Sequence, residues 1–217
     1  MPRHLLLRSI TAFSLALAGA AQATETTYRY DTVHSQVLFS IDHNGFSRPF
    51  GRLHIAKGVL KLDPANLASA STELDIDLSS LDMGDSAWNA AVLKPGLLDG
   101  SKYPLAHFAS TGVELKDANH GILHGKLTLH GVTRPVDITF TFNRAGTTIY
   151  GLHTVAGFSG NLMLDRTDYG IQAFKNSIGQ KVSIWLEIEA IKDANADNPA
   201  TPSSAKTSTT AQENPSP

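Results

Sequence analysis

The chain has 217 residues, no cysteine, and 18 Lys and Arg against 20 Asp and Glu, which gives a net charge of −2. The lack of cysteine excludes both a disulfide framework and a lipid-modified cysteine. The balanced charge, without a basic patch, argues against nucleic acid as a partner.

The first residues have the features of an export signal. Arg3 and Arg8 precede a short apolar run over residues 10–21, and Ala21-Gln22-Ala23 fits an A-x-A cleavage site. The apolar run is too short to span a bilayer. We therefore predict a signal peptide over residues 1–23, an exported protein, and no stable membrane insertion.

The other end of the chain is also unlike a folded segment. Residues 193–217 contain four prolines and many small polar residues, and they lack large apolar side chains. Such a composition buries too little apolar surface to offset the entropy of ordering. The sequence thus predicts a disordered polar tail over 193–217 and one folded domain over 24–192. Without the two arginines of the signal peptide, 16 basic face 20 acidic side chains, a net charge of −4.

Between these ends, apolar and polar residues alternate with a period of two, which is typical of strands with one buried face. The alternation predicts strands near residues 37–43, 53–62, 74–78, 105–115, 121–129, 136–142, 152–164 and 182–188. No helical pattern of ten residues lies between them, which argues against a parallel βαβ fold. Residues 127–142 predict a β-hairpin, with its turn at Gly131, Val132 and Thr133.

Two predicted strands switch their buried parity at a glycine, at Gly58 and at Gly112. An extra residue at each point, a β-bulge, would restore the buried face and bend the strand sharply. A closed barrel needs such bends, although a sandwich also uses them at its corners. The sequence therefore favours an all-β fold, a single antiparallel barrel of about eight strands, over a sandwich.

One segment predicts a short helix. Residues 85–93 begin with Asp85, a good N-cap, and Pro95 follows their end. Trp88 and Val92 are four residues apart and share one helix face. We expect this helix near one opening of the barrel. The alternative is a surface connection whose tryptophan fills a gap in the core.

Four motifs in order resemble one known family. They are LTLHGVTRPV (127–136), KYPLAHFAST (102–111), DRTDYGI (165–171) and an opening with Asp31, His34, Ser35, His43 and Gly51. Over residues 28–191 the chain resembles the YceI-like family of lipocalin-like, polyisoprenoid-binding periplasmic proteins. The resemblance implies a lipocalin-like barrel, a periplasmic location, and an isoprenoid lipid, such as a quinone or polyprenyl chain, as ligand. It also implies that the protein can form a homodimer and that it has a role in isoprenoid handling or the stress response.

The polar residues do not predict catalysis or a metal site. His120 and His124 on one strand would lie roughly 13 Å apart, too far for one ion with bonds of about 2 Å. Ser35 and His34 are neighbours on a strand and point to opposite faces. We expect them to satisfy backbone groups where the strand begins. Arg166, beside Asp168, is expected to form a local ion pair or to hold the end of the barrel.

His43 has the parity of the inward residues before it and could bind a lipid head group, or it could bond a turn carbonyl instead. Glycines at 125, 157 and 160 are expected to leave space in the barrel. We predict no turnover and no cofactor. We expect the inward residues to bind one long lipid, and they are Phe39, Ile41, His43, Leu74, Ile76, Trp88, Phe108, Leu127, Leu129, Ile138, Phe140, Phe158 and Leu162. Two alternatives stay open: a quinone-modifying or redox accessory protein that uses His43, and a filled-barrel interaction protein without ligand.

Overall fold

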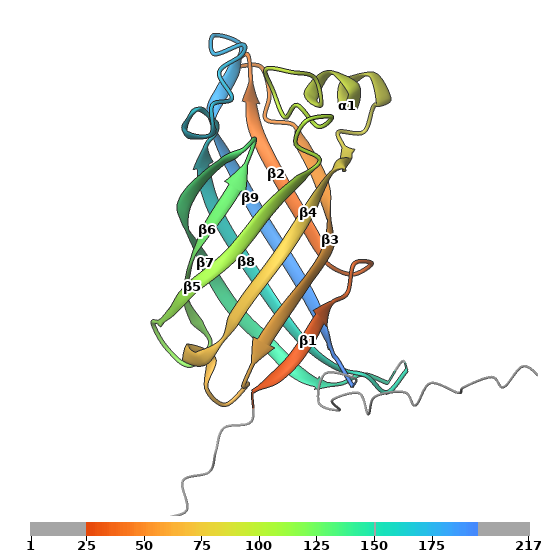
Figure 1. The fold of residues 1–217 in the computed structure, drawn as a ribbon, viewed down its shortest axis with the longest axis vertical. Coiled ribbons are helices and arrows are strands. Elements are labelled where there is room, and N and C mark those ends of the chain that lie inside the picture. Colours follow the sequence, from red (N-terminus) through yellow and green to blue (C-terminus); the bar gives the residue numbers. More distant parts are fainter. Residues whose placement is uncertain (1–24, 150, 195–217) are drawn as a thin grey trace, which may run out of the picture.

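The computed structural model describes residues 25–149 and 151–194. The predicted signal peptide lies outside these residues, as does the predicted tail beyond residue 194, so both stay predictions. The described chain forms one tall antiparallel barrel with a helix at one end (Figure 1). Below, the end that carries the helix is called the upper end.

Nine strands, one α-helix and two 3-10 helices make up the described residues. The strands are β1 (Thr26–Tyr30), β2 (Gln36–His43), β3 (Phe50–Leu62), β4 (Ser71–Asp82), β5 (Leu105–Leu115), β6 (His120–Leu129), β7 (Val132–Thr147), β8 (Thr154–Asp165) and β9 (Ile178–Lys192). The helices are η1 (Leu67–Ser69), α1 (Ser86–Val92) and η2 (Arg166–Tyr169).

Neighbouring strands follow one another in the order β3, β2, β9, β8, β7, β6, β5 and β4. The sheet closes into a barrel because the first and last of these, β3 and β4, also pair with each other. Strands β1 and β2 share one position in this ring, since both pair with β3 and β9. β1 pairs with the lower part of β3, near Leu60, and β2 with its upper part, near Leu53. The barrel therefore has eight strand positions, and the predicted antiparallel barrel of about eight strands is confirmed.

The two ends of the barrel are covered differently. At the upper end, α1 begins after Asp85, whose carboxylate accepts a hydrogen bond of 2.9 Å from the amide of Trp88. The predicted short helix and its N-cap are thus confirmed. At the lower end, η1 turns the buried side chain of Leu67 into the barrel, beside Leu62 and Tyr28. No helix of the described residues is long and apolar enough to cross a membrane.

The parity switches do reflect bulges, but one lies elsewhere than predicted. In β3 the register against β4 shifts between Ile55 and Lys57, so the extra residue is Ala56 and not Gly58. Gly58 is instead paired regularly with Leu74, and a Cβ there would lie 2.7 Å from the ring of Tyr30. In β5 the extra residue is Thr111, directly before Gly112, so this bulge lies next to the predicted glycine.

Two other boundaries differ from the sequence prediction. The turn between β6 and β7 consists of His130 and Gly131, both with positive φ (52° and 76°), while Val132 and Thr133 already pair with β6. Positive φ at both central residues is the geometry of a two-residue type I′ hairpin. Leu152 lies in the turn before β8 and is exposed, so it does not share the buried face of that strand.

Candidate functional site

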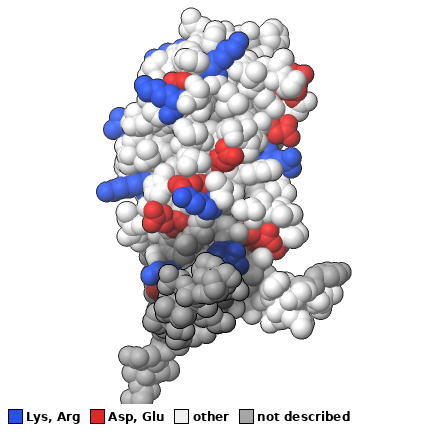
Figure 2. Space-filling view, turned by 45° about the vertical axis from the view of Figure 1, so that its right-hand side comes forward, with Lys and Arg blue, Asp and Glu red and all other residues white. Residues whose placement is uncertain are grey.

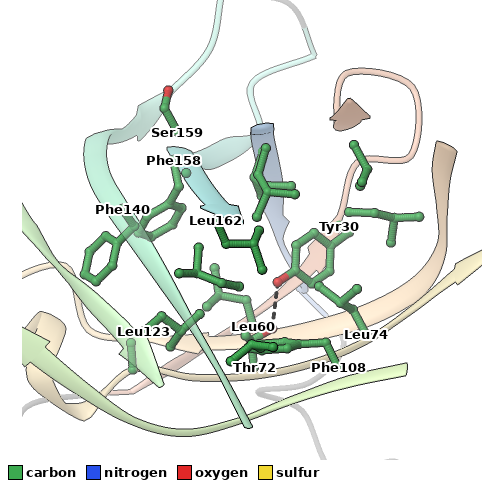
Figure 3. A pocket seen from close by; sticks show the side chains of 18 of the residues that line it. Tyr30, Leu60, Thr72, Leu74, Phe108, Leu123, Phe140, Phe158, Ser159 and Leu162 are labelled. Atoms are coloured by element: carbon green, nitrogen blue, oxygen red, sulfur yellow. Dashed lines mark hydrogen bonds between the residues drawn. The ribbon is translucent and has the colours of Figure 1, made fainter. Parts of the chain in front are cut away.

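The lower half of the barrel encloses an apolar chamber, called here the lower chamber. The volume open to the centre of a water molecule in it is about 150 Å³. Its walls come from β1 to β9 and η1, and almost no polar atom faces the space. Figure 3 shows Phe140 and Phe158 at one side of the chamber and Tyr30 at the other. The lower chamber thus suits an apolar ligand.

The upper half encloses a second apolar space, the upper chamber, with a corresponding volume of about 170 Å³. Trp88 and Val92 of α1 line it, together with Leu97 and Leu98 of the loop that follows. The predicted face of the helix therefore covers the upper end of the barrel. This position favours the predicted placement of the helix near one opening of the barrel.

The two chambers meet at a ring of four shared residues. Val37, Ile76, Leu127 and Ile184 line both spaces. No more than one layer of side chains therefore separates the chambers. A chain that passes this ring would be surrounded by apolar groups on both sides of it.

All thirteen residues predicted to bind ligand lie in these walls. The lower chamber contains Leu74, Ile76, Phe108, Leu127, Ile138, Phe140, Phe158 and Leu162, and the upper chamber contains Phe39, Ile41, His43, Ile76, Trp88, Leu127 and Leu129. The strand periodicity placed all of them except Trp88 of α1, because alternate residues of a strand face the lumen. Their contact with a ligand stays a prediction.

A polar pair in the lower chamber was not predicted. The hydroxyl groups of Tyr30 and Thr72 lie 2.6 Å apart (Figure 3), and Thr72 also donates to the carbonyl of Val59 at 2.8 Å. Because Thr72 uses its proton there, Tyr30 donates to Thr72. Burial raises the pKa of Tyr30 to about 12, although the bond to Thr72 lowers it, so the phenol stays neutral. Strand β1 has five residues, so its alternation of apolar and polar side chains was too short to predict that Tyr30 faces the lumen.

Glycine leaves less space in the lumen than expected. The ring of Phe108 lies against Gly125 and occupies the room of the missing side chain. Gly160 does line the lower chamber, and a Cβ there would lie 3.2 Å from Ile138. Gly157 lines neither chamber. Only one of the three glycines therefore contributes to the cavity as expected.

The contact of Phe108 with Gly125 predicts the effect of a methyl group at this position. Gly125→Ala should lower the free energy of unfolding by about 1–3 kcal/mol, because Phe108 would have to move and a Cβ would lie 2.8 Å from the carbonyl of Ala109. Gly112→Ala is the matched control in the next strand, where a Cβ meets nothing within 4 Å. Denaturant unfolding should show a change below about 1 kcal/mol for the control. Equal losses in both variants would contradict this interpretation.

His43 lies at the mouth of the upper chamber. It is the last residue of β2, so it is exposed at the rim although it lines the chamber, and the register against β9 shifts between Ile41 and His43. Its ring lies 5.7 Å from that of Trp88, centroid to centroid. His43 thus keeps the inward parity of Phe39 and Ile41 but lies at the rim, and its contact with a lipid head group stays a prediction.

Arg166 holds the upper end of the barrel. Its guanidinium, 4% exposed, donates to the carbonyls of Gly179 (2.8 Å), Ile171 (2.9 Å) and Ile178 (3.0 Å). Burial lowers the pKa of Arg166, but arginine still stays charged at neutral pH. Of the two predicted roles, the structure supports the one in which Arg166 holds the end of the barrel, because these bonds join η2 to Ile171 in the following loop and to the first two residues of β9. Arg166 and Asp168 do not form the expected ion pair. Asp168 is exposed, and its backbone carbonyl accepts a hydrogen bond from Arg134.

The opening motif forms an exposed polar cluster on the outer surface. One ring nitrogen of His34 and one carboxylate oxygen each of Asp31 and Glu189 lie within 4.8 Å of one another. His34 Nδ1 is 2.7 Å from Asp31, which also accepts from two backbone amides. Ser35 is buried, donates to the carbonyl of Glu189 and accepts from its amide, at 3.0 and 3.2 Å. The predicted role of Ser35 in satisfying backbone groups is confirmed.

The pair of His34 and Asp31 predicts a pH dependence of stability. The hydrogen bond to Asp31 raises the pKa of His34 above its ordinary value of 6.5. The pair therefore stabilises the fold fully between pH 3.8 and pH 6.5, where Asp31 is ionised and His34 is protonated, and this contribution is lost as the pH rises through the raised pKa of His34. In denaturant unfolding, the difference between wild type and His34→Gln should be largest between pH 3.8 and pH 6.5 and should shrink above this range. A difference that does not change with pH would contradict the assignment.

The fold and the site define a closed antiparallel β-barrel with an apolar lumen. A family model described as the YceI-like domain matches residues 28–190, so the chain belongs to the YceI-like family. A UPF0312 protein of Vibrio cholerae is 33% identical over 180 residues, which cover 82% of this chain and 93% of that protein. A UPF0312 protein of Pseudomonas savastanoi is 33% identical over 192 residues, 87% and 99% of the two chains.

Solved structures share the fold. BcnA of Burkholderia cenocepacia superposes with a TM-score of 0.66 at 24% identity, over 74% of this chain and 98% of its own. A polyisoprenoid binding domain of Saccharophagus degradans, described as implicated in plant cell wall breakdown, superposes with a TM-score of 0.57 at 17% identity. That match covers 77% of this chain and 99% of the domain. At these identities the likeness concerns the fold.

Proposed function

We propose that this protein binds a single long apolar lipid of the polyisoprenoid class in its two chambers and shields the chain from water. The observation that carries the proposal is the lumen, two adjoining spaces that almost no polar atom faces. The family and the polyisoprenoid binding domain of similar fold support this class of ligand.

The chambers favour a tail over a head group. Each methylene group removed from water contributes about 0.8 kcal/mol, whereas a polar group without a partner in the lumen would cost free energy. The lipid therefore places its tail in the barrel and its head group at the mouth, beside His43 and Trp88. Binding of this kind needs no bond to form or break, so the proposed role is sequestration without turnover. The predicted signal peptide supports the periplasm as the place where it acts.

The space in the lumen also weighs against the filled-barrel interaction protein. That alternative requires the inward side chains to occupy the whole interior. Volumes of about 150 and 170 Å³ remain instead between them. Genuinely apolar cavities of such size stay dry and bind apolar molecules.

The test is to purify the full chain from its native host, extract it with organic solvent and identify the extract by mass spectrometry. We expect one dominant isoprenoid species, and we expect it to displace a fluorescent apolar dye from the delipidated protein. An extract without lipid, together with a folded barrel that binds no dye, would overturn the proposal. A dominant lipid of another class would retain the binding role and replace the ligand.

A further inference from the structure

Two loops at the upper end of the barrel expose phenylalanine side chains to water. Phe46, between β2 and β3, is 87% exposed, and Phe174, between η2 and β9, is 64% exposed. Neither residue lines a chamber. Burial of a phenylalanine is favourable, so both side chains would gain free energy if a partner surface covered this end of the molecule.

The two loops are built to hold these side chains in place. The amide of Asn44 donates to the carbonyl of Ser177 at 2.6 Å, which ties one loop to the other. The amides of Ser177 and Ile178 both donate to the carbonyl of Phe174, at 2.9 and 2.8 Å. Phe174 has a φ of 55°, a conformation that is uncommon for a bulky residue. Strain of this kind is retained where a site requires it.

Basic side chains flank both phenylalanines. Arg48 follows Phe46 by two residues and Lys175 follows Phe174 directly, and both are exposed. Within residues 25–149 and 151–194, neither forms an ion pair. The carboxylate nearest to Arg48 in the sequence is that of Asp42, and it accepts a hydrogen bond from the amide of Gly45. In Figure 2 the uppermost side chains are uncharged, and side chains of both signs, Lys or Arg and Asp or Glu, lie below them.

The same loops border the mouth of the upper chamber. His43 and Pro49, on either side of Phe46 in the sequence, line that chamber, and so does Ile178, the first residue of β9 after the second loop. A lipid tail that enters the barrel here from a bilayer would avoid water if the mouth touched the membrane. Exposed aromatic side chains next to basic ones are the combination that binds an anionic membrane surface.

We propose that the upper end docks on an anionic phospholipid bilayer, with Phe46 and Phe174 inserted among the acyl chains and Arg48 and Lys175 against the phosphates. Docking then brings the mouth of the upper chamber to the membrane, so that a lipid passes between bilayer and lumen. The transfer step rests on the proposed lipid binding, whereas the docking contact does not.

The experiment measures flotation of the mature chain with two kinds of vesicles, phosphatidylcholine alone and phosphatidylcholine mixed with phosphatidylglycerol. We expect binding to the mixed vesicles and weaker binding to the neutral ones. Phe46→Ser with Phe174→Ser should weaken binding at least about tenfold. Arg48→Gln with Lys175→Gln should weaken it about fivefold per residue on the anionic vesicles alone.

The matched control is at the opposite end of the barrel. Ile149 and Leu152, between β7 and β8, are 84% and 79% exposed, and Ile149→Ser with Leu152→Ser should leave vesicle binding unchanged. Binding of a fluorescent apolar dye in solution should be equal in all variants, which separates docking from occupancy of the lumen. The proposal is overturned if the wild type binds neither vesicle, if the phenylalanine variant binds as well as the wild type, or if the control loses as much.

Discussion

Arg166→Met should lower the free energy of unfolding by about 3–5 kcal/mol. The substitution keeps the length of the side chain but leaves three carbonyls, those of Gly179, Ile171 and Ile178, without their charged donor in a buried place. Hydrogen bonds from charged groups are worth about 1.5–3 kcal/mol each, and such bonds in one network do not add fully.

The effect should extend to the upper chamber. Ile171 and Ile178 form part of its wall, and the bonds of Arg166 fix the segment that carries them. We therefore expect faster amide hydrogen exchange in residues 171–179 of the variant and weaker binding of an apolar dye. Arg166→Lys should be intermediate, because a compact ammonium cannot reach three carbonyls in the planar arrangement that a guanidinium offers.

Arg134→Met is the matched control for this prediction. Arg134 is exposed and donates to one carbonyl, that of Asp168, at 3.1 Å. Denaturant unfolding should show a loss below about 1 kcal/mol for this variant. If Arg166→Met is no more harmful than Arg134→Met, the guanidinium does not hold the upper end of the barrel.

Much of the barrel could be predicted because its signals are local. Alternation in each strand identifies the face that points inward, and all thirteen predicted ligand-binding residues lie in the chamber walls. The N-cap and the proline that bound the helix are likewise features of neighbouring residues. The family motifs added the ligand class, which periodicity alone cannot supply.

Other features depend on the pairing between strands and therefore escape a reading of one strand at a time. The bulge in β3 lies at Ala56 because the register against β4 shifts there, and the glycine nearby only suggested a place. The register shift beside His43 likewise arises in its partner β9, which has extra residues there. Tyr30 and Thr72 meet only because β1 and β4 both pair with β3.

The empty space itself was the least predictable feature. A lumen remains only where the side chains are smaller than the ring of strands can hold, and that difference depends on rotamers. Phe108 turns over Gly125 and so occupies space that the sequence suggested was open. Conversely, the sequence did not show that Ile184 and the three other shared residues line both chambers, so that the two spaces lie next to each other. The same alternation would serve a solid core, so periodicity cannot separate the two cases.

A tryptophan at the ring between the chambers should therefore shorten the ligand that fits. Ile184 of β9 lines both spaces, and Ile184→Trp should block the passage between them. A long isoprenoid would then lose burial of several methylene groups at about 0.8 kcal/mol each, which is an affinity loss of about a hundredfold or more. A short chain that fits in one chamber should change by less than about threefold.

Displacement of a fluorescent apolar dye by isoprenoid alcohols of increasing length measures this effect. In the wild type, affinity should rise with length until both chambers are filled, whereas in Ile184→Trp it should stop rising at the length of one chamber. Ile184→Leu, with the same volume, is the control and should follow the wild type. Val37→Phe narrows the same ring from β2 and provides an independent test if the tryptophan variant does not fold. An equal loss for short and long chains would mean that the two chambers do not act as one site.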